Sequence, residues 1–214
     1  MAGLAITVAQ QKGGAGKTTL AAHLAVAWAR VGLRVATVDI DPQGSLTRWM
    51  EARQAALGDT GLTHAQITGW RTQATVAQLV ADHDIVVIDS PPHAETEAKI
   101  AVRAAQLVVV PLQPSPMDLW ATQPMLDLAK AEKRPVLLVL NRVPSRTRLG
   151  DALMREIGKL GVPVAAAHIG NRTAFAAALL DGASVSETGP RTRAAEEIAT
   201  LAAEILDHCR QGRA

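Results

Sequence analysis

Short apolar runs alternate with amphipathic segments along the whole chain of 214 residues. Continuous runs of Val, Ile and Leu predict buried strands, and apolar residues spaced three or four positions apart predict helices. We therefore expect strands at 4–9, 34–38, 85–88, 107–110, 136–140 and 164–167. We expect helices at 17–31, 45–57, 75–82, 95–104, 116–131, 149–160, 173–180 and 193–210. Residues 58–70 are ambiguous, and a short edge strand is one reading of them.

This alternation predicts an α/β fold. Strands that are apolar at every position are typical of a mostly parallel, twisted sheet that helices cover on both faces. The sequence shows no internal repeat, low-complexity segment or long linker, so we expect one domain over residues 1–214. Ligands of such sheets bind at the carboxyl ends of the strands, where candidate polar residues should gather.

A glycine-rich loop joins the first expected strand to the first expected helix. Residues 10–19 read Gln-Gln-Lys-Gly-Gly-Ala-Gly-Lys-Thr-Thr. Glycines let the backbone turn tightly and point its N–H groups inward, and the helix N-terminus adds more N–H groups, so the loop is suited to phosphate. Lys17 is placed to reach the β- and γ-phosphates of a nucleotide, and Thr18 is placed to ligate Mg²⁺.

The loop departs from the general phosphate-loop pattern at two positions. Gln11 stands where that pattern has glycine, and an additional lysine, Lys12, follows it. The run Lys-Gly-Gly-Ala-Gly-Lys-Thr resembles the deviant Walker A loop of the ParA/MinD family of ATPases. The resemblance implies a P-loop NTPase fold that binds ATP or ADP with Mg²⁺. It also implies an ATP-dependent homodimer in which Lys12 reaches the other subunit's phosphates, so that Lys12 and Lys17 are catalytic. The expected nucleotide-binding residues of the loop are Lys12, Gly13, Gly14, Ala15, Gly16, Lys17, Thr18 and Thr19.

Two carboxylates, Asp39 and Asp41, follow the second expected strand. Residues at i and i+2 of an extended segment point the same way, so both can approach a magnesium–phosphate cluster. The segment also resembles the D-x-D-P-Q segment of the family, which implies that Asp41 is catalytic and helps to organise the hydrolytic water. We assign Asp39 to the metal. A turn that starts the next helix is the alternative reading, and both readings can hold together.

A third carboxylate, Asp89, ends the apolar run at 85–88. A carboxylate at the end of a central strand is the Walker B arrangement, which holds Mg²⁺ directly or through water. Thr18, Asp39 and Asp89 are therefore the expected metal-site residues. Asp84 precedes the same strand, so we expect it at the opposite edge of the sheet in a structural role.

Asn141 and Arg142 follow the strand expected at 136–140. They resemble an Asn-Arg pair that lies beside the adenine in this family, and an amide offers an adenine edge both a donor and an acceptor. An asparagine that merely starts a loop is the alternative. Residues 113–118, Gln-Pro-Ser-Pro-Met-Asp, resemble a segment that lies near the nucleotide and the dimer interface in small ParA-like proteins.

Charge narrows the choice of partners only in part. The net charge is +2, but residues 133–172 carry a local excess of basic side chains. A solvated face and a patch for DNA phosphates are both open readings. The basic residues of this segment are Lys133, Arg134, Arg142, Arg146, Arg148, Arg155, Lys159 and Arg172. Arg191 and Arg193 resemble basic positions that contact DNA in the family.

Several protein classes fit the sequence poorly. The single cysteine, Cys209, excludes a disulfide framework. No apolar run approaches the ~20 residues of a membrane span, and no leader is recognisable, so we expect a cytoplasmic protein without membrane insertion. The last expected helix has an apolar stripe and an acidic face, which favours core packing over binding to anionic lipid. His93 and His168 have no partners at metal-ligand spacing and are expected to be structural.

Taken with the resemblance, these features predict a weak, partner-stimulated ATP hydrolase of the partitioning type. The ATP-bound homodimer is expected to bind nucleoid DNA non-specifically and to move a plasmid, a chromosome region or a protein assembly. A ParB-like or cargo-adaptor protein is expected to stimulate hydrolysis. A MinD-like membrane-associated regulator of division is the alternative, and it needs a basic membrane helix. Iron–sulfur proteins with this loop need more cysteines, and a ligase of the dethiobiotin synthetase type needs further polar side chains near the γ-phosphate.

Overall fold

A parallel sheet forms the centre of the molecule. The computed structural model describes residues 3–92, 95–144 and 151–212. Within these ranges the sheet has six strands in the order β3-β2-β4-β1-β5-β6, and every neighbouring pair is parallel. The strands are β1 (Leu4–Val8), β2 (Val35–Asp39), β3 (Thr63–Gln66), β4 (Ile85–Asp89), β5 (Leu107–Leu112) and β6 (Val136–Leu140). The ambiguous segment at 58–70 therefore supplies the edge strand β3.

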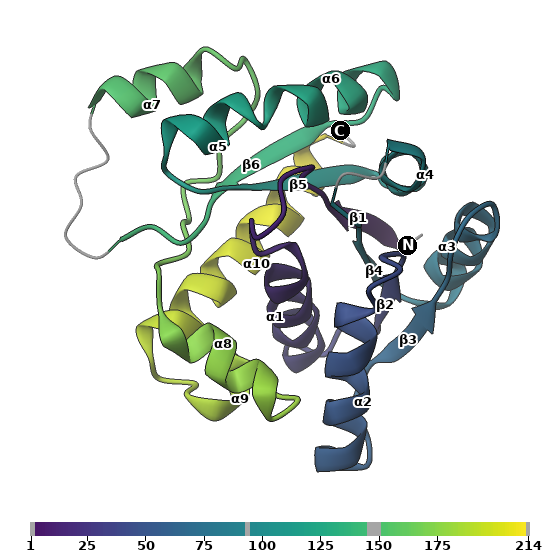
Figure 1. Cartoon of the computed structure of the whole chain (residues 1–214). Coiled ribbons are helices and arrows are strands. Elements are labelled where there is room, and N and C mark those ends of the chain that lie inside the picture. The colour runs from purple at the N-terminus through teal and green to yellow at the C-terminus, as the bar shows by residue number, and fades with distance from the viewer. Residues whose placement is uncertain (1–2, 93–94, 145–150, 213–214) are drawn as a thin grey trace.

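Helices cover both faces of this sheet, so the predicted α/β fold is confirmed (Figure 1). On one face, α1 and α10 pack together with α8 and α9, and α2 packs against α1. On the other face lie α3, α4, α6 and α7. The helices are α1 (Lys17–Arg30), α2 (Ser45–Leu57), α3 (Arg71–Asp82), α4 (Glu95–Ala104), α5 (Pro116–Trp120), α6 (Gln123–Ala131), α7 (Asp151–Gly158), α8 (Thr173–Leu180), α9 (Val185–Thr188) and α10 (Arg193–Gln211).

The apolar side chains of the central strand β1 pack on both faces of the sheet. Ile6 and Val8 join the core cluster under α1 and α10, whereas Ala5 and Ala9 join the clusters on the other face. Successive side chains of a strand point to opposite faces. Because helices cover both faces of the sheet, β1 is apolar except at Thr7, whose buried hydroxyl donates a hydrogen bond to the Ala101 carbonyl oxygen at 2.9 Å.

The strand expected at 164–167 is wrong. Val164 forms only an isolated bridge with Leu138. The backbone N–H groups of Ala166 and Ala167 donate instead to the carboxylate oxygens of Glu204, at 2.7 Å and 2.8 Å. A side chain of α10 thus takes the donors that a seventh strand would give to the sheet, and the segment leaves the sheet after one bridge.

The single helix expected at 116–131 is also wrong, because the structure divides it into α5 and α6. Pro124 occupies one of the first two positions of α6. Proline has no N–H group to continue a helical ladder from the preceding turn, so it is tolerated where a helix begins. The short helix α9 was not expected, although Ser184 and Glu187 form a capping box at its start.

The basic segment at 133–172 does not form one patch among the described residues. Lys133 and Arg134 precede β6 and Arg142 follows it, so they lie at opposite ends of a strand about 16 Å long. Lys159 pairs with Glu156 at 2.6 Å, and Arg172 is paired as well. Arg146, Arg148 and His93 lie outside the described residues. The structure thus favours a distributed charge over a single DNA-binding patch in this segment.

Two expectations for single residues, Asp84 and Cys209, are confirmed. Asp84 lies at the amino edge of the sheet and pairs with Arg34 at 2.9 Å. Cys209 is buried on the apolar stripe of α10. In the described part of the chain, none of the helices combines the length and the apolar character that crossing a membrane requires.

Candidate nucleotide-binding site

The glycine-rich loop leaves β1 and turns directly into α1. Gly14 and Gly16 have φ angles of 75° and 87°, which favour glycine because a Cβ atom makes the left-handed region costly. Gly16 is the N-cap of α1, and Lys17 begins the helix. The free N–H groups of this helix start therefore open onto the loop, where they suit an anion.

Lys17 and Thr18 point their side chains to the carboxyl edge of the sheet. Lys17 is only 7% exposed, and burial lowers the pKa of its ammonium group, although the carboxylates of Asp89 and Asp41 oppose that shift. The Thr18 hydroxyl donates a hydrogen bond to Asp89 Oδ2 at 2.6 Å. This hydrogen bond connects the start of α1, directly after the loop, to the end of β4.

Asp89 is the buried carboxylate at this edge. Burial raises the pKa of Asp89 to about 7, against the opposing effects of the Thr18 hydrogen bond and the Lys17 charge. Its second oxygen, Oδ1, is buried and has no hydrogen-bond partner among the described residues. An unpartnered buried carboxylate oxygen beside a threonine hydroxyl fits Mg²⁺, which prefers oxygen ligands and shares them with substrate phosphates.

No group of three or more His, Cys, Asp or Glu side chains is arranged to hold a metal ion in the described part of the chain. A magnesium ion at Thr18 and Asp89 would therefore need phosphate oxygens to complete its ligands. This requirement is typical of nucleotide-bound magnesium, which one or two protein oxygens hold together with the substrate.

The structure gives Asp39 and Asp41 different surroundings. Asp39 is fully buried, and its Oδ2 accepts hydrogen bonds from both the N–H group and the hydroxyl of Thr47, at 2.8 Å and 2.9 Å. Its Oδ1 accepts from the Asp41 N–H group at 3.1 Å. Asp39 therefore organises the turn into α2, and a direct role at Mg²⁺ stays a prediction.

Asp41 reaches the cavity beside the loop. The cavity has a volume of about 680 Å³, and Lys17 and Thr18 line it together with Asp41. Asp41 Oδ1 accepts a hydrogen bond from the Gln43 N–H group at 2.9 Å, which fixes the carboxylate at the start of the turn. The geometry brings the predicted hydrolytic carboxylate to the phosphate side of the loop, where its catalytic role stays a prediction.

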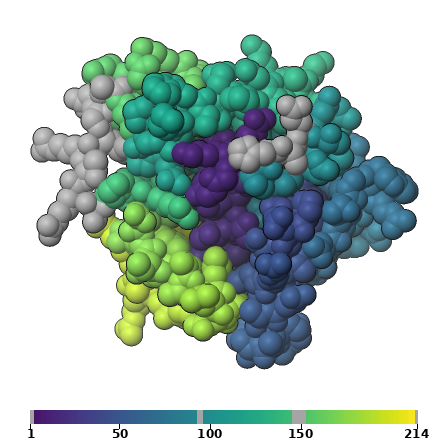
Figure 2. Space-filling model, viewed as in Figure 1, coloured from purple at the N-terminus to yellow at the C-terminus, as the bar shows by residue number. Residues whose placement is uncertain are grey.

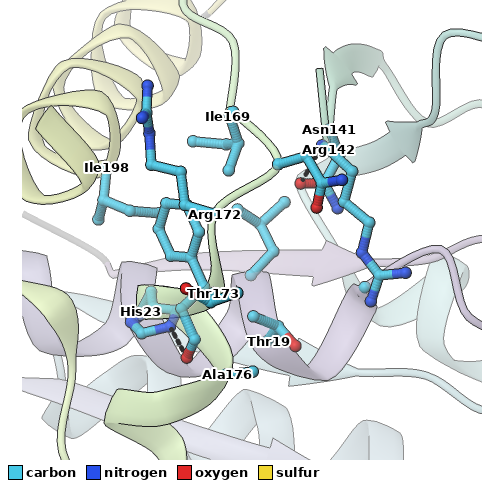
Figure 3. A pocket seen from close by; sticks show the side chains of 14 residues that line it. Thr19, His23, Asn141, Arg142, Ile169, Arg172, Thr173, Ala176 and Ile198 are labelled. Atoms are coloured by element: carbon cyan, nitrogen blue, oxygen red, sulfur yellow. Dashed lines mark hydrogen bonds between the residues drawn. The ribbon is translucent and has the colours of Figure 1, made fainter. Parts of the chain in front are cut away.

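A second cavity, of about 250 Å³, adjoins the first and shares Gly16, Thr19 and Arg142 with it (Figure 3). Asn141 and Arg142 line one side of it, and His23 from α1 and Phe175 from α8 contribute an apolar wall. This position beside the phosphate loop suits the base and sugar of a nucleotide. The structure thus places the two predicted adenine residues at a suitable cavity, while the contact with adenine stays a prediction.

Lys12 has a partner that the sequence did not indicate. Its ammonium group forms an ion pair with Asp118 Oδ2 at 2.8 Å, and the lysine side chain is 38% exposed. Asp118 lies in α5, where Ser115 caps the helix by accepting a hydrogen bond from the Asp118 N–H group. Only the tertiary fold brings the two residues together, because they are far apart in sequence. Asp118 ends the segment 113–118, which the sequence analysis compared with a segment near the nucleotide and the dimer interface, but its pairing with Lys12 was not expected.

The site combines a loop suited to phosphate at a helix start, a lysine and a threonine beside the loop, and carboxylates at neighbouring strand ends. These features define a P-loop nucleotide-binding protein. The sequence model of the CobQ/CobB/MinD/ParA nucleotide binding domain matches residues 6–185. The chain belongs to this family, and its predicted resemblance to ParA/MinD proteins is confirmed.

Named relatives span nearly the whole chain. The maintenance of carboxysome distribution protein A of Halothiobacillus neapolitanus is 32% identical over 209 residues, which are 94% of this chain and 95% of the relative. The protein of the same name from Gloeobacter kilaueensis is 37% identical over 213 residues, with coverages of 94% and 93%.

Solved structures agree with this fold. A Cyanothece McdA–ATP complex superposes with a TM-score of 0.77 at 16% identity, covering 94% of each chain. The MinD protein of Pyrococcus horikoshii, complexed with Mg-ADP, superposes with a TM-score of 0.77 at 20% identity, covering 94% of this chain and 95% of that one. The family is that of a nucleotide binding domain, and the loop and Asp89 fit the predicted cofactors, an adenine nucleotide and Mg²⁺.

Proposed function

We propose that this chain is a weak ATP hydrolase that acts as an ATP-dependent positioning switch. The observation that carries the proposal is the placement of Lys12 next to the phosphate loop but outside the cavity that Lys17 lines. ATP is proposed to join two copies of the chain face to face, with Lys12 of each copy contacting the phosphates bound by the other.

The partial exposure of Lys12 supports a role in a second copy. Lys17 is nearly buried and serves its own loop, whereas the Lys12 side chain is 38% exposed and forms an ion pair only with Asp118 in the described part of the chain. The lysine side of this pair is partly exposed and can reach another anion, while the buried Asp118 carboxylate keeps a hydrogen bond from the Ser115 hydroxyl. Phosphate oxygens of a second copy are a stronger partner for an ammonium group than a single carboxylate.

The surface around the loop also supports a face-to-face contact. The loop lies near the centre of one face of the molecule, and α2, α5 and α8 surround it (Figure 2). Met117 and Trp120 of α5 are 66% and 69% exposed, and Leu180 of α8 is 83% exposed. Large exposed apolar side chains around a polar site are typical of protein–protein contacts.

Within each copy, the residues have separate roles in hydrolysis. Lys17 and the loop N–H groups are proposed to bind the triphosphate, and Thr18 and Asp89 to hold Mg²⁺, which when bound neutralises charge that develops on the phosphates. Asp41 is proposed to orient the attacking water from its position in the same cavity. Asn141 and Arg142 line the cavity proposed for the base.

The cargo is proposed from the relatives rather than from the site. Two relatives that span almost the whole chain are named for the distribution of carboxysomes, so we favour a large protein assembly over a plasmid or a chromosome region. An adaptor protein is proposed to stimulate hydrolysis.

The ATP-bound dimer is proposed to hold nucleoid DNA non-specifically in the cytoplasm, with Arg191 and Arg193 among the exposed basic residues. The whole chain, residues 1–214, is proposed to act as one ATPase domain.

No observation favours the membrane-associated alternative. The apolar stripe of α10 is buried, and it includes Ile198, Leu201 and Ile205. Its acidic residues Glu197 and Glu204 accept hydrogen bonds from backbone N–H groups of residues 166–170, the segment before α8. A helix engaged in this way has no free apolar face to offer a bilayer.

The experiment that tests the proposal measures self-association with and without ATP. The wild-type chain should sediment as a dimer with ATP and Mg²⁺ and as a monomer without nucleotide. Lys12→Ala should bind a fluorescent ATP analogue and yet remain a monomer. Lys159→Ala, which removes an exposed lysine just after α7, is the matched control and should dimerise normally. Normal ATP-dependent dimers of Lys12→Ala would overturn the proposal.

A further inference from the structure

Two side-chain amides hold consecutive carbonyl groups of the phosphate loop. Gln113 Nε2, just after β5, donates a hydrogen bond to the carbonyl oxygen of Gly14 at 3.0 Å. Asn141 Nδ2, just after β6, donates to the carbonyl oxygen of Ala15 at 2.7 Å. The amides follow the ends of β5, which neighbours β1, and of β6, which neighbours β5, so two adjacent strands of the sheet reach across to the loop.

Asn141 is itself held in place. Its backbone N–H group donates to the carbonyl oxygen of Leu112 at 2.9 Å, and its Oδ1 accepts from the Arg142 N–H group at 3.0 Å. The side chain is buried, and the residue is only 6% exposed. Since the amide oxygen is fixed toward Arg142, the amide nitrogen must point at the loop (Figure 3).

Gly16 makes this approach possible. A Cβ atom added to Gly16 would lie 2.6 Å from Asn141 Nδ2, closer than such atoms come in proteins. The φ angle of Gly16 is also 87°, a second reason for glycine. The glycine that defines the loop in the sequence therefore also makes room for the asparagine that contacts the loop.

We propose that Gln113 and Asn141 are positioning residues for the triphosphate. A peptide unit whose carbonyl oxygen is held on one side points the N–H group of the next residue to the other side. Fixing the Gly14 and Ala15 carbonyls thus orients the N–H groups of Ala15 and Gly16 before nucleotide arrives. An anion site that is ordered in advance does not need to spend binding energy on ordering the loop.

The inference rests on the proposed nucleotide binding, but not on dimerisation, DNA binding or the choice of cargo. It changes the role expected of Asn141 from reading adenine to supporting the loop. The two roles predict different measurements. Loss of a residue that contacts the base lowers the affinity for nucleotides only, whereas loss of a residue that supports the loop lowers the affinity for every triphosphate.

The test measures the binding of three ligands by calorimetry: ATP, GTP and inorganic tripolyphosphate, each with Mg²⁺. The variant Asn141→Leu keeps the approximate shape of the side chain but removes the donor. It should lower the affinity for all three ligands by a similar factor of about ten, which corresponds to about 1.4 kcal/mol of binding free energy. A loss of ATP binding with unchanged tripolyphosphate binding would overturn the proposal and return Asn141 to the base.

Gln113→Ala provides a second, independent test in case Asn141→Leu folds poorly. Gln113 is on the surface and its hydrogen bond is longer, so a smaller loss of about threefold is expected for all three ligands. Gln123→Ala is the matched control, because Gln123 is an exposed glutamine whose side chain donates a hydrogen bond to Asp127 of its own helix and lies away from the loop. Equal affinities of the Gln113 and Gln123 variants would count against the proposal.

Two further measurements separate positioning from general structure. Amide hydrogen exchange of the ligand-free protein should be faster at residues 14–16 in the Asn141 variant and unchanged in β1. In steady-state hydrolysis KM should rise while kcat stays close to the wild-type value, because Asp41 is untouched. Uniformly faster exchange across the sheet would show a structural defect instead. If the wild-type chain binds none of the three ligands, the proposed function itself is contradicted. If the wild-type chain binds them and the variants bind them equally well, only the positioning role is contradicted.

Discussion

The two ends of β4 carry aspartates with opposite environments. Asp84, just before the strand, accepts hydrogen bonds from the backbone and the guanidinium group of Arg34, which lower the pKa of Asp84 to about 2. Asp89, at the end of the strand, is buried, with its pKa raised to about 7 and one oxygen unpartnered among the described residues. The amino edge of the sheet thus satisfies its charges internally, and the carboxyl edge leaves one carboxylate for a ligand.

This comparison teaches that burial alone does not mark the site. His23 is as buried as Asp89, but its ring is fully bonded: Nδ1 accepts from the Val185 N–H group, which leaves Nε2 to donate to the Phe175 carbonyl oxygen at 3.1 Å. What distinguishes Asp89 is the missing partner for a buried polar atom. Variants at these three residues, and at those that surround the loop, can break or sharpen the comparison.

The largest effect is expected for Asp89→Asn. Removing the carboxylate should lower Mg²⁺-dependent ATP hydrolysis by at least about 1000-fold, since a bound metal supplies several kcal/mol of charge stabilisation. The ligand-free variant should melt at a higher temperature than the wild type, because it no longer buries an unpaired acid. Phosphate release and differential scanning calorimetry measure both effects. A lower melting temperature would mean that Asp89 serves the fold.

Asp41→Ala should have the next largest effect. Loss of a group that orients water typically costs a factor of 10²–10⁴, and we expect a decrease of kcat by about 300-fold. ATP binding and dimerisation should persist, because Thr18, Lys17 and Lys12 remain. Single-turnover hydrolysis together with sedimentation checks this combination, and hydrolysis at the wild-type rate would remove Asp41 from the mechanism.

His23 should make stability depend on pH. Burial lowers the pKa of His23 from 6.5 to about 4. A histidine with a lowered folded pKa binds fewer protons when folded, so its contribution to stability is fully present above pH 6.5 and is lost as the pH falls toward 4. The loss should be about 3 kcal/mol. Urea unfolding at several pH values measures it, and His23→Gln should flatten the curve; identical pH slopes would contradict the assignment.

Asp118→Asn should have a smaller effect, on dimerisation. The substitution weakens the ion pair that holds Lys12 within its own chain. If this pair competes with the phosphates of a second copy, the ATP-dependent dimer should form at a concentration several-fold lower, consistent with an ion pair worth about 1 kcal/mol or less. Sedimentation over a range of protein concentrations measures the shift. Weaker dimers would mean that Asp118 contributes to the dimer interface.

Asp84→Asn should have the smallest effect and serves as the control for Asp89→Asn. It breaks an exposed pair at the amino edge, so a small decrease in melting temperature and unchanged hydrolysis are expected. A clear loss of ATP hydrolysis in this variant would erase the distinction between the two edges.

Much of the fold was predictable because its strands are short, continuous and apolar. The central strands and α1, α2, α4 and α8 lie close to their expected ranges. The strand expected at 164–167 was wrong because a side chain distant in sequence, Glu204, accepts hydrogen bonds from the backbone N–H groups of Ala166 and Ala167. The division of α5 from α6 was predictable in principle from Pro124, and the capping box at Ser184 signalled α9.

The candidate site was predictable where a local pattern carries the chemistry. The loop fixes the positions of Lys17 and Thr18, and the end of an apolar strand fixes that of Asp89. The contacts of Lys12 with Asp118, and of Asn141 and Gln113 with the loop, join segments that only the folded sheet brings together. No spacing in the sequence encodes these contacts, so single-sequence patterns could not reveal them.

The most direct test of the central claim, that Lys12 serves a second copy, is a mixing experiment. Lys12→Ala and Asp41→Ala should each hydrolyse ATP poorly alone. In a mixed dimer, the site of the Lys12→Ala chain keeps its own Asp41 and receives Lys12 from the other chain. An equal mixture should therefore hydrolyse ATP well above the rate of either variant alone, at about a quarter of the wild-type rate if the chains pair at random and each mixed dimer has one complete site. A mixture as inactive as its components would contradict the account.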